Sequence, residues 1–250
     1  MDTTAGPAAE VALITGASSG IGAETARRFA DAGTNVVLAA RSETSLTAVA
    51  DDCEAAGVDA LVVPTDVTDY EAVAALVDAT TERFGRLDTV VVNAGIGEQR
   101  DAPVDELPLE QFERVTATNV HGAYYTTRAS VPALRDADGS LVFVGSYKGK
   151  HPSTSTPVYA ASKWWLRGFA LSVAGQVGPD GVGVTLVSPS GVTTNFGSEF
   201  RDRTNVVALD DASTLDPADV AEAIAYAVSQ EAPATVTELD LNRRDIYERF

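Results

Sequence analysis

The chain has 250 residues, 45% of them hydrophobic and 22% charged, which is the balance of a globular protein with a sizeable core. Its formal net charge of −18 disfavours nucleic acid and anionic membranes as partners, because both would repel it. No apolar run approaches the ~20 residues that span a bilayer, residues 1–10 do not resemble a secretory signal, and Cys53 is the lone cysteine, so we expect a cytoplasmic protein.

The first predicted elements are a strand over residues 11–14 and a helix over 23–32, joined by a segment with three glycines. Gly16, Gly20 and Gly22 lack a Cβ, so the backbone can turn tightly and a bulky anion can come close. The N-terminus of the following helix offers N–H groups and a partial positive charge to a pyrophosphate. A strand, a glycine turn and a helix in this order predict a dinucleotide site, although the glycine spacing differs from G-x-G-x-x-G. The alternative is a plain strand-to-helix turn.

Apolar strand-like runs and helical patterns alternate along the remaining chain. Further strands are predicted over 35–40, 59–65, 89–93, 140–145, 183–188 and 236–241. Helices are predicted over 44–56, through 72–77, over 109–134 and 157–177, and from Pro217 behind the N-cap Asp216. This alternation predicts a three-layer, doubly wound α/β fold, with a seven-stranded, mainly parallel sheet and helices on both faces. We expect one domain over 1–250, with substrate loops near 94–108 and 189–215.

The end of the second predicted strand bears on the choice of dinucleotide. Folds that bind NAD commonly place an acid there for the ribose 2′-hydroxyl, whereas an arginine accommodates the 2′-phosphate of NADP. This chain has Ala40 followed by Arg41, and the hydroxyls of Ser18 and Ser19 could add contacts. We therefore predict a preference for NADP(H), with NAD(H) as the alternative if Arg41 is only a solvated surface residue.

Tyr159 and Lys163 are four residues apart, which places them on one face of a predicted helix. A phenol with a pKa near 10 is a poor base at neutral pH, and a neighbouring ammonium favours the phenolate. Ser146 follows the fifth predicted strand and is expected at the same rim of the sheet. This combination predicts acid–base chemistry, with Lys163 lowering the pKa of Tyr159.

These motifs together resemble the ordered motif set of the short-chain dehydrogenases/reductases. The resemblance extends over essentially the whole chain, and it implies that the chain has the Rossmann fold of that family. The resemblance rests on residues 15–22, Asn93-Ala94-Gly95, Asn119, Ser146, Tyr159 and Lys163. It implies that Tyr159 is the general acid/base, that Ser146 holds the substrate oxygen, that Lys163 binds the nicotinamide ribose and that Asn119 holds a relay water. The implied cofactor-binding residues are Gly16, Ser18, Ser19, Gly20, Ile21, Gly22, Arg41, Asp66, Val67, Asn93, Gly95, Tyr159, Lys163, Val192 and Thr194.

Structural interpretations stand beside some of these roles. Asn93 and Gly95 also hold adjacent strands together in the family, Asn119 could bond only helix backbone, and Asp66 could only cap a turn. The family usually has Pro-Gly after the sixth strand, where this chain has Pro189-Ser190. His121 and His151 are too isolated in the sequence to predict a metal site.

The resemblance implies an NADP(H)-dependent enzyme that interconverts a carbonyl and a primary or secondary alcohol. The alternatives are an NAD-dependent hydroxy-acid or sugar dehydrogenase of the same family and a catalytically silent NADP-sensing protein. Four cationic residues lie in segments that could border the pocket: Lys148, Lys150, Arg201 and Arg203. They favour an anionic substrate if they line the pocket, and the alternative is that they are solvated surface charges.

Two further expectations concern assembly and surroundings. The helices that carry Tyr124, Trp164 and Trp165 have more apolar surface than one sheet face needs, so we expect a homotetramer or homodimer rather than only a thick core. Lys148, Lys150 and Lys163 are the only lysines in this acidic chain. An acidic, lysine-poor surface indicates a salt-rich cytoplasm, where ~1 M salt shortens the Debye length to about 3 Å and screens the repulsion. The alternative is an acidic protein from an ordinary cytoplasm.

Overall fold

The structure is a computed structural model that describes residues 9–201 and 214–246. Within them, seven strands form one sheet in the order β3-β2-β1-β4-β5-β6-β7, and all the strand pairs are parallel. The strands are β1 Val11–Thr15, β2 Asn35–Ala40, β3 Ala60–Pro64, β4 Thr89–Val92, β5 Ser140–Val144, β6 Gly183–Pro189 and β7 Glu238–Leu241. The chain order reverses between β1 and β4, and a crevice forms at the carboxyl ends of the strands at such a point.

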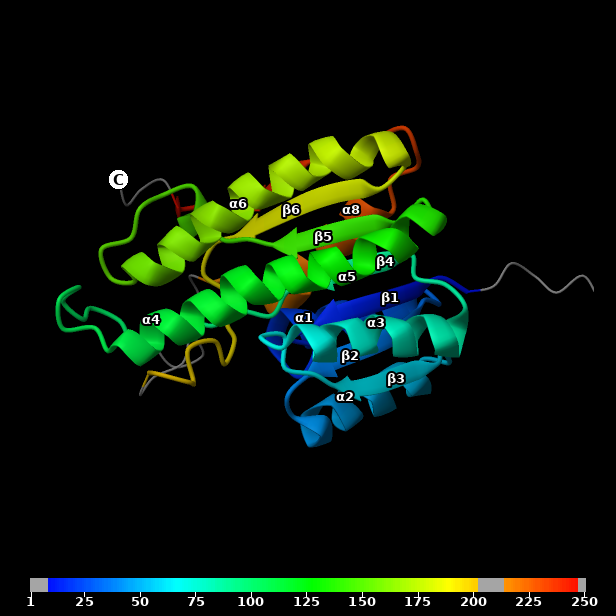
Figure 1. The fold of residues 1–250 in the computed structure, drawn as a ribbon, viewed down its shortest axis with the longest axis horizontal. Coiled ribbons are helices and arrows are strands. Elements are labelled where there is room, and N and C mark those ends of the chain that lie inside the picture. The colour runs from blue at the N-terminus through cyan, green and yellow to red at the C-terminus, as the bar shows by residue number, and fades with distance from the viewer. Residues whose placement is uncertain (1–8, 202–213, 247–250) are drawn as a thin grey trace, which may run out of the picture.

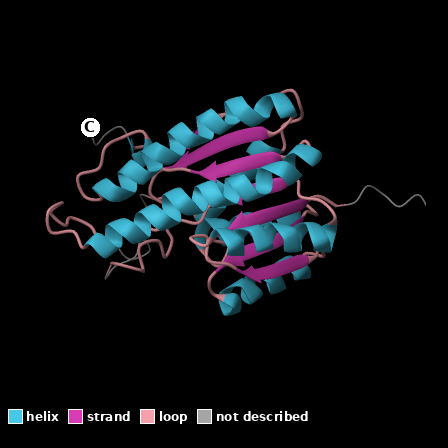
Figure 2. Cartoon of the chain, in the orientation of Figure 1, coloured by secondary structure: helices cyan, strands magenta, loops and turns pink. Residues whose placement is uncertain are grey.

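Helices cover both faces of the sheet, as Figures 1 and 2 show. They are α1 Gly20–Asp31, α2 Glu43–Ala55, α3 Tyr70–Phe84, α4 Leu109–Thr116, α5 Ala123–Asp136, α6 Pro157–Val177 and α8 Pro217–Val228. Buried side chains of α1, α2 and α8 pack on one face, and those of α3, α5 and α6 pack on the other. The predicted three-layer, doubly wound fold is confirmed. No helix among the described residues is long and apolar enough to cross a membrane.

Two predicted elements differ from the structure. The helix expected over 109–134 is interrupted by a π-helical segment, Ala117–Gly122, which contains the buried Asn119. The last strand begins at Glu238 instead of residue 236. The carbonyl oxygens of Val236 and Thr237 do accept bonds, from the Thr185 hydroxyl and the Leu186 N–H, but the regular pairing with β6 starts only at Glu238.

The start of α8 follows the sequence prediction closely. Asp216 is the N-cap and Pro217 is the first helical residue. The Asp216 carboxylate accepts from the Ala218 N–H at 2.9 Å, and the Asp219 carboxylate accepts from the Asp216 N–H at 2.9 Å. These reciprocal bonds satisfy N–H groups that the helix itself leaves unpaired.

Glu238 at the start of β7 offers a test of stability against pH. Arg167 on α6 donates to it from two nitrogens, at 2.7 and 2.9 Å, and the Lys150 ammonium lies 3.1 Å away. The Arg167 bonds, followed by those of Lys150, outweigh burial and hold the pKa of Glu238 at about 2, compared with an ordinary 4.5. Because the folded pKa is the lower one, this carboxylate stabilises the fold above about pH 4.5, and its contribution is lost as the pH falls towards 2.

We therefore expect Glu238→Gln to lower the melting temperature at neutral pH, and its difference from the wild type to disappear as the pH falls from about 4.5 to 2. Thermal unfolding followed by circular dichroism across this range measures both. Asp180→Asn is the matched control, since Asp180 pairs with Arg135 while both side chains are more than 40% exposed, and such pairs contribute little. A loss of stability that is the same at every pH would contradict the role of Glu238.

Candidate active site

A cleft of about 820 Å³ lies at the carboxyl ends of the strands, with lining residues from the loops after β1, β2, β3, β4, β5 and β6. Every catalytic or cofactor-binding residue predicted from the sequence lines this cleft except Gly22 and Asn119, and of the predicted substrate-side cations Lys148 and Arg201 line it but Lys150 does not. The predicted loops 94–108 and 189–215 both contribute to it, although residues 202–213, including Arg203, lie outside the described part of the chain.

The glycine turn is held against β4 by Asn93. The Asn93 amide donates to the carbonyl oxygens of Thr15 and Gly16, at 2.9 and 3.2 Å, and its backbone N–H donates to the Thr15 hydroxyl at 3.0 Å. Gly16 has φ +67°, a conformation that favours glycine. A Cβ on Gly22 would lie 2.3 Å from the Gly16 oxygen, so that position has no room for a side chain. Asn93 thus has the strand-holding role, in addition to lining the cleft.

The N-terminus of α1 is open towards the cleft. Its N-cap residue, Ser19, makes no side-chain bond to the helix, and its first turn contains no acidic residue. The N–H groups of this turn therefore face the cleft without a competing carboxylate from the helix, which is the arrangement that binds phosphate. Thr194, from the loop after β6, lies over the turn, since its Cγ2 would be 3.0 Å from a Cβ on Gly20.

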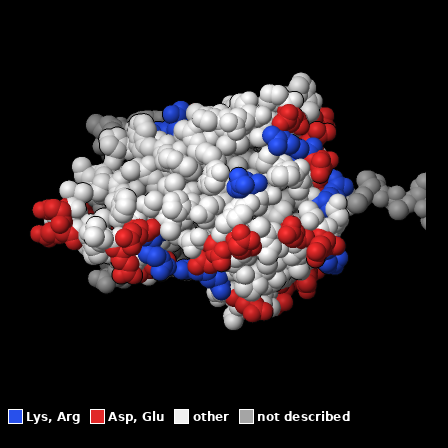
Figure 3. Space-filling view, in the orientation of Figure 1, with Lys and Arg blue, Asp and Glu red and all other residues white. Residues whose placement is uncertain are grey.

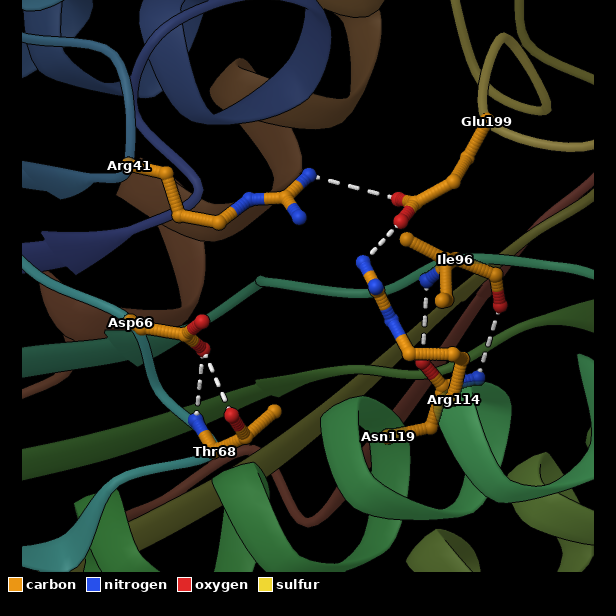
Figure 4. A network of polar contacts seen from close by, with 7 residues as sticks. All are labelled: Arg41, Asp66, Thr68, Ile96, Arg114, Asn119 and Glu199. Atoms are coloured by element: carbon orange, nitrogen blue, oxygen red, sulfur yellow. Dashed lines mark hydrogen bonds and ion pairs between the residues drawn. The ribbon is translucent and has the colours of Figure 1, made fainter. Parts of the chain in front are cut away.

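A network of charged residues lines the cleft near the end of β2 (Figure 4). Arg41, at the end of β2, and Arg114, on α4, both pair with the carboxylate of Glu199, the former at 3.2 Å. Glu199 comes from the loop after β6, so this loop reaches across the cleft to both arginines. Asp66 accepts from the Thr68 N–H and hydroxyl, at 3.0 and 2.8 Å. Asp66 therefore caps a turn, which is the structural role considered for it in the sequence analysis, and it also lines the cleft.

At the opposite end of the cleft, Tyr159 and Ser146 line the wall together. Burial is the largest influence on Tyr159 and raises its pKa, and the nearby Ser146 hydroxyl and the charge of Arg201 only partly oppose it. That Lys163 lowers this pKa remains a prediction from the sequence. The Lys163 ammonium lies 5.8 Å from the centre of the Tyr159 ring and donates to the Val144 carbonyl at 2.8 Å, while burial lowers its own pKa to about 8.

The Asn119 side chain is occupied by protein partners. It accepts from the Ile96 N–H at 2.9 Å and donates to the Ile96 carbonyl at 2.9 Å, as Figure 4 shows, and it also donates to the Ser162 hydroxyl at 2.9 Å. With 2% exposure it joins the loop after β4 to α6. These bonds connect the π-helical segment to the loop after β4 and to α6. They are not bonds to the backbone of its own helix, which was the structural alternative to the relay role of Asn119.

Glu98 is a site residue that the sequence patterns did not indicate. It is 1% exposed, and its carboxylate accepts from the N–H groups of Val158, at 2.9 Å, and Tyr159, at 3.0 Å. The N-cap of α6, Thr156, makes no side-chain bond of its own to the helix. Glu98 therefore caps α6 from a distant loop and fixes the first turn that carries Tyr159.

Ser190, the departure from the family pattern, joins the end of β6 to the end of β7. Its N–H donates to the Leu241 carbonyl at 2.8 Å, and its hydroxyl accepts from the Arg243 N–H at 3.2 Å. Val192 and Thr194 keep their places along the cleft. No group of three or more His, Cys, Asp or Glu side chains suited to a metal ion occurs within 9–201 and 214–246.

A doubly wound sheet with a glycine turn at its switch point and a Ser–Tyr–Lys group beside it places the protein in the class of Rossmann-fold enzymes and their relatives. Residues 10–205 match the family described as short chain dehydrogenase. The chain belongs to this family, and the resemblance found in its motifs is confirmed.

Similar proteins support the same conclusion. An uncharacterized oxidoreductase of Staphylococcus saprophyticus is 34% identical over 234 residues, which cover 92% of this chain and 95% of that protein. The structure of an alcohol dehydrogenase from Thermococcus sibiricus, complexed with 5-hydroxy-NADP, has a TM-score of 0.85 and 29% identity, covering 94% of this chain and 97% of that one. A 3-ketoacyl-(acyl-carrier-protein) reductase from Brucella melitensis, complexed with NADH, has a TM-score of 0.83 and 30% identity, covering 93% and 96%.

Proposed function

We propose that the protein is an NADP(H)-dependent oxidoreductase that interconverts a carbonyl group and a primary or secondary alcohol. The observation that carries the proposal is the place of Tyr159 and Ser146 in one cleft, whose other end is an open helix N-terminus behind a glycine turn. The nicotinamide compounds complexed with the two similar proteins above support the choice of cofactor class.

The cofactor supplies the hydride when it is bound, and the protein supplies placement and the proton. In the reducing direction Tyr159 gives its proton to the carbonyl oxygen, and Ser146 donates a hydrogen bond to the same oxygen. Because burial raises the pKa of Tyr159, the phenol stays protonated at neutral pH, which is the state that reduction requires. Lys163 binds the nicotinamide ribose, and Asn119 belongs to the proton relay behind it.

The residues of the cleft fit a dinucleotide. The absence of a Cβ at Gly16 and Gly22 leaves the turn compact, and the first turn of α1 provides N–H groups for the pyrophosphate. Asp66, Val67 and Asn93 line the cleft beyond β3 and β4, where the adenosine would lie. Val192 and Thr194 line the opposite side and are the residues we assign to the nicotinamide carboxamide.

The preference for NADP(H) is supported by the charges at the adenosine end. Ala40 leaves no carboxylate at the end of β2, and Arg41 and Arg114 converge on one anionic group, the Glu199 carboxylate (Figure 4). A 2′-phosphate offers the same arginines a doubly charged partner with three acceptor oxygens. Glu199 would then give up Arg41 to the cofactor.

We expect Arg41→Ala to raise the Kd for NADPH by about tenfold while changing the Kd for NADH much less, because a charge-assisted bond contributes roughly 1.5–3 kcal/mol and this one is partly solvated. Fluorescence titration with both cofactors measures the effect. Arg83→Ala is the matched control: Arg83, in the last turn of α3, does not line the cleft and is 53% exposed in its pair with Asp59, compared with 60% for Arg41. Tighter binding of NADH than of NADPH by the unaltered protein would contradict the preference.

A screen of NADPH oxidation and, in parallel, of NADH oxidation over aldehydes, ketones and oxo acids in molar KCl tests the activity itself. Consumption of NADPH excludes the silent cofactor-sensing protein. Consumption of NADH alone favours the NAD-dependent hydroxy-acid or sugar dehydrogenase instead.

We also propose that the protein forms a homotetramer or homodimer through the helices on the α5 and α6 face. Tyr124, Trp164 and Trp165 are 42%, 47% and 37% exposed on these helices. The surface over them in Figure 3 is largely uncharged, and the acidic residues gather towards its edges. Large exposed aromatic side chains in an uncharged area are typical of an interface.

The charge of −18 and the three lysines support a cytoplasm rich in salt as the protein's surroundings, since salt screens repulsion among carboxylates. The cytoplasm also suits Cys53, which is buried and free.

A further inference from the structure

Three cationic side chains gather at the substrate end of the cleft: Arg100, Lys148 and Arg201 all line it together with Ser146 and Tyr159. They come from the loop after β4, the turn after β5 and the loop after β6. In a chain of net charge −18, a concentration of positive charge beside the reactive hydroxyl requires an explanation.

Lys148 is built into the frame that presents Ser146 and Tyr159. Its backbone N–H donates to the Ser146 hydroxyl oxygen at 3.1 Å. Its ammonium donates to the Thr156 hydroxyl at 2.6 Å, immediately before the helix that carries Tyr159. The ammonium therefore lies between the two elements that would hold the substrate oxygen.

Arg201 is placed on the other side of Tyr159. Its Nε donates to the Glu98 carbonyl at 2.7 Å, and its guanidinium lies over the Phe196 ring, 5.1 Å from the ring centre. The Phe196 and Tyr159 rings are in turn 5.2 Å apart. The Phe196 ring thus fixes the guanidinium in the wall of the cleft, close enough for Arg201 and Tyr159 to influence each other's charge.

Among the residues that the structure describes, no acidic side chain forms an ion pair with Lys148 or Arg201. The Glu98 carboxylate is buried and faces the N–H groups at the start of α6, and Asp101 is an exposed residue that does not line the cleft. Burial, followed by the charges of Arg100 and Arg201, lowers the pKa of Lys148 to about 8, against the smaller opposing influence of Glu98 and Asp101. An anion in the cleft would remove this repulsion.

We propose that the substrate is a carbonyl compound that carries a carboxylate, which Lys148 and Arg201 bind while the carbonyl oxygen lies against Ser146 and Tyr159. Arg100, at the exposed mouth, draws the anion in. This substrate class rests on the proposed oxidoreductase activity. Lys150, only two residues beyond Lys148, has no part in it, because it pairs with Glu238 and Asp240 and does not line the cleft.

The test compares kcat/KM for an oxo acid and for its methyl ester, with NADPH and the full-length protein. We expect the wild type to favour the acid by at least about tenfold in kcat/KM. Lys148→Met or Arg201→Gln should bring the acid-to-ester ratio of kcat/KM close to one, mostly by raising the KM of the acid. The reason is that each substitution removes a charge-assisted bond that strengthens binding by about 10- to 100-fold. Lys150→Gln is the matched control and should keep the wild-type ratio. A wild type that uses acid and ester equally, or variants that lose both in the same proportion, would overturn the proposal.

Binding without turnover separates this proposal from the oxidoreductase assignment. Isothermal titration calorimetry with the acid and with the ester, in the presence of NADP⁺, measures binding of each compound without turnover. Tighter binding of the acid that depends on Lys148 and Arg201 supports the site even if neither compound is reduced, in which case only the reaction has failed. Equal binding of the two compounds rejects the anion site whether or not turnover occurs.

Discussion

Tyr159→Phe is expected to lower kcat by about 10²- to 10⁴-fold, the usual contribution of a positioned general acid, while the Kd for NADPH stays within about twofold. The substitution removes the phenolic oxygen that faces the cleft with Ser146 and leaves the ring in contact with Phe196. Steady-state kinetics on a carbonyl found in the screen, with fluorescence titration of NADPH, measures both quantities.

The control removes a phenolic oxygen elsewhere. Tyr226 lies on α8, is 57% exposed and does not line the cleft, so Tyr226→Phe should leave kcat unchanged within about twofold. Wild-type turnover by Tyr159→Phe would reject the proposed acid and, with it, the assigned chemistry.

Gly22→Ala is expected to abolish measurable NADPH binding and to lower the melting temperature by several degrees. The added Cβ would lie 2.3 Å from the Gly16 oxygen and 2.7 Å from the Asn93 amide nitrogen. The first of these is backbone that cannot rotate away, so the turn has to move. Overpacking of this kind costs about 1–3 kcal/mol and displaces the N–H groups that would hold the pyrophosphate.

Gly168→Ala is the matched control for this change. Gly168 is an exposed residue inside α6, and a Cβ there would meet nothing within 4 Å. Alanine in such a position is expected to stabilise the helix by about 0.5–1 kcal/mol and to leave NADPH binding unchanged. Thermal unfolding and NADPH titration of the two variants side by side give the comparison. Normal cofactor affinity in Gly22→Ala would mean that the dinucleotide does not use this turn.

Burial raises the pKa of Tyr159 above its ordinary value, so the phenol is protonated at neutral pH, while the Lys163 ammonium donates to the Val144 carbonyl. A protonated phenol suits delivery of a proton to a substrate. Oxidation of an alcohol, which needs the phenolate, would require additional stabilisation of that charge.

Local patterns in the chain were sufficient for the fold and for the order of the site motifs. Continuous apolar runs identified the strands, since a parallel strand is buried on both faces, and Asp216-Pro217 identified the start of α8, since capping depends on neighbouring residues. The glycine turn could be recognised for the same reason: the features that define it lie within residues 11–32. The break at Asn119 could not, because the bonds made by its side chain go to Ile96 and Ser162, far along the chain.

Only the tertiary structure decided what surrounds the reactive groups. Glu98 is 61 residues from Tyr159 and Glu199 is 158 residues from Arg41, yet each pair is joined by a hydrogen bond. The pKa of Tyr159 depends on how deeply the ring is buried, and the sequence spacing of Tyr159 and Lys163 carries no information on depth. Electrostatic effects depend on distance and dielectric environment, so charges such as Lys148 and Arg201 acquired a role only when folding placed them in one cleft.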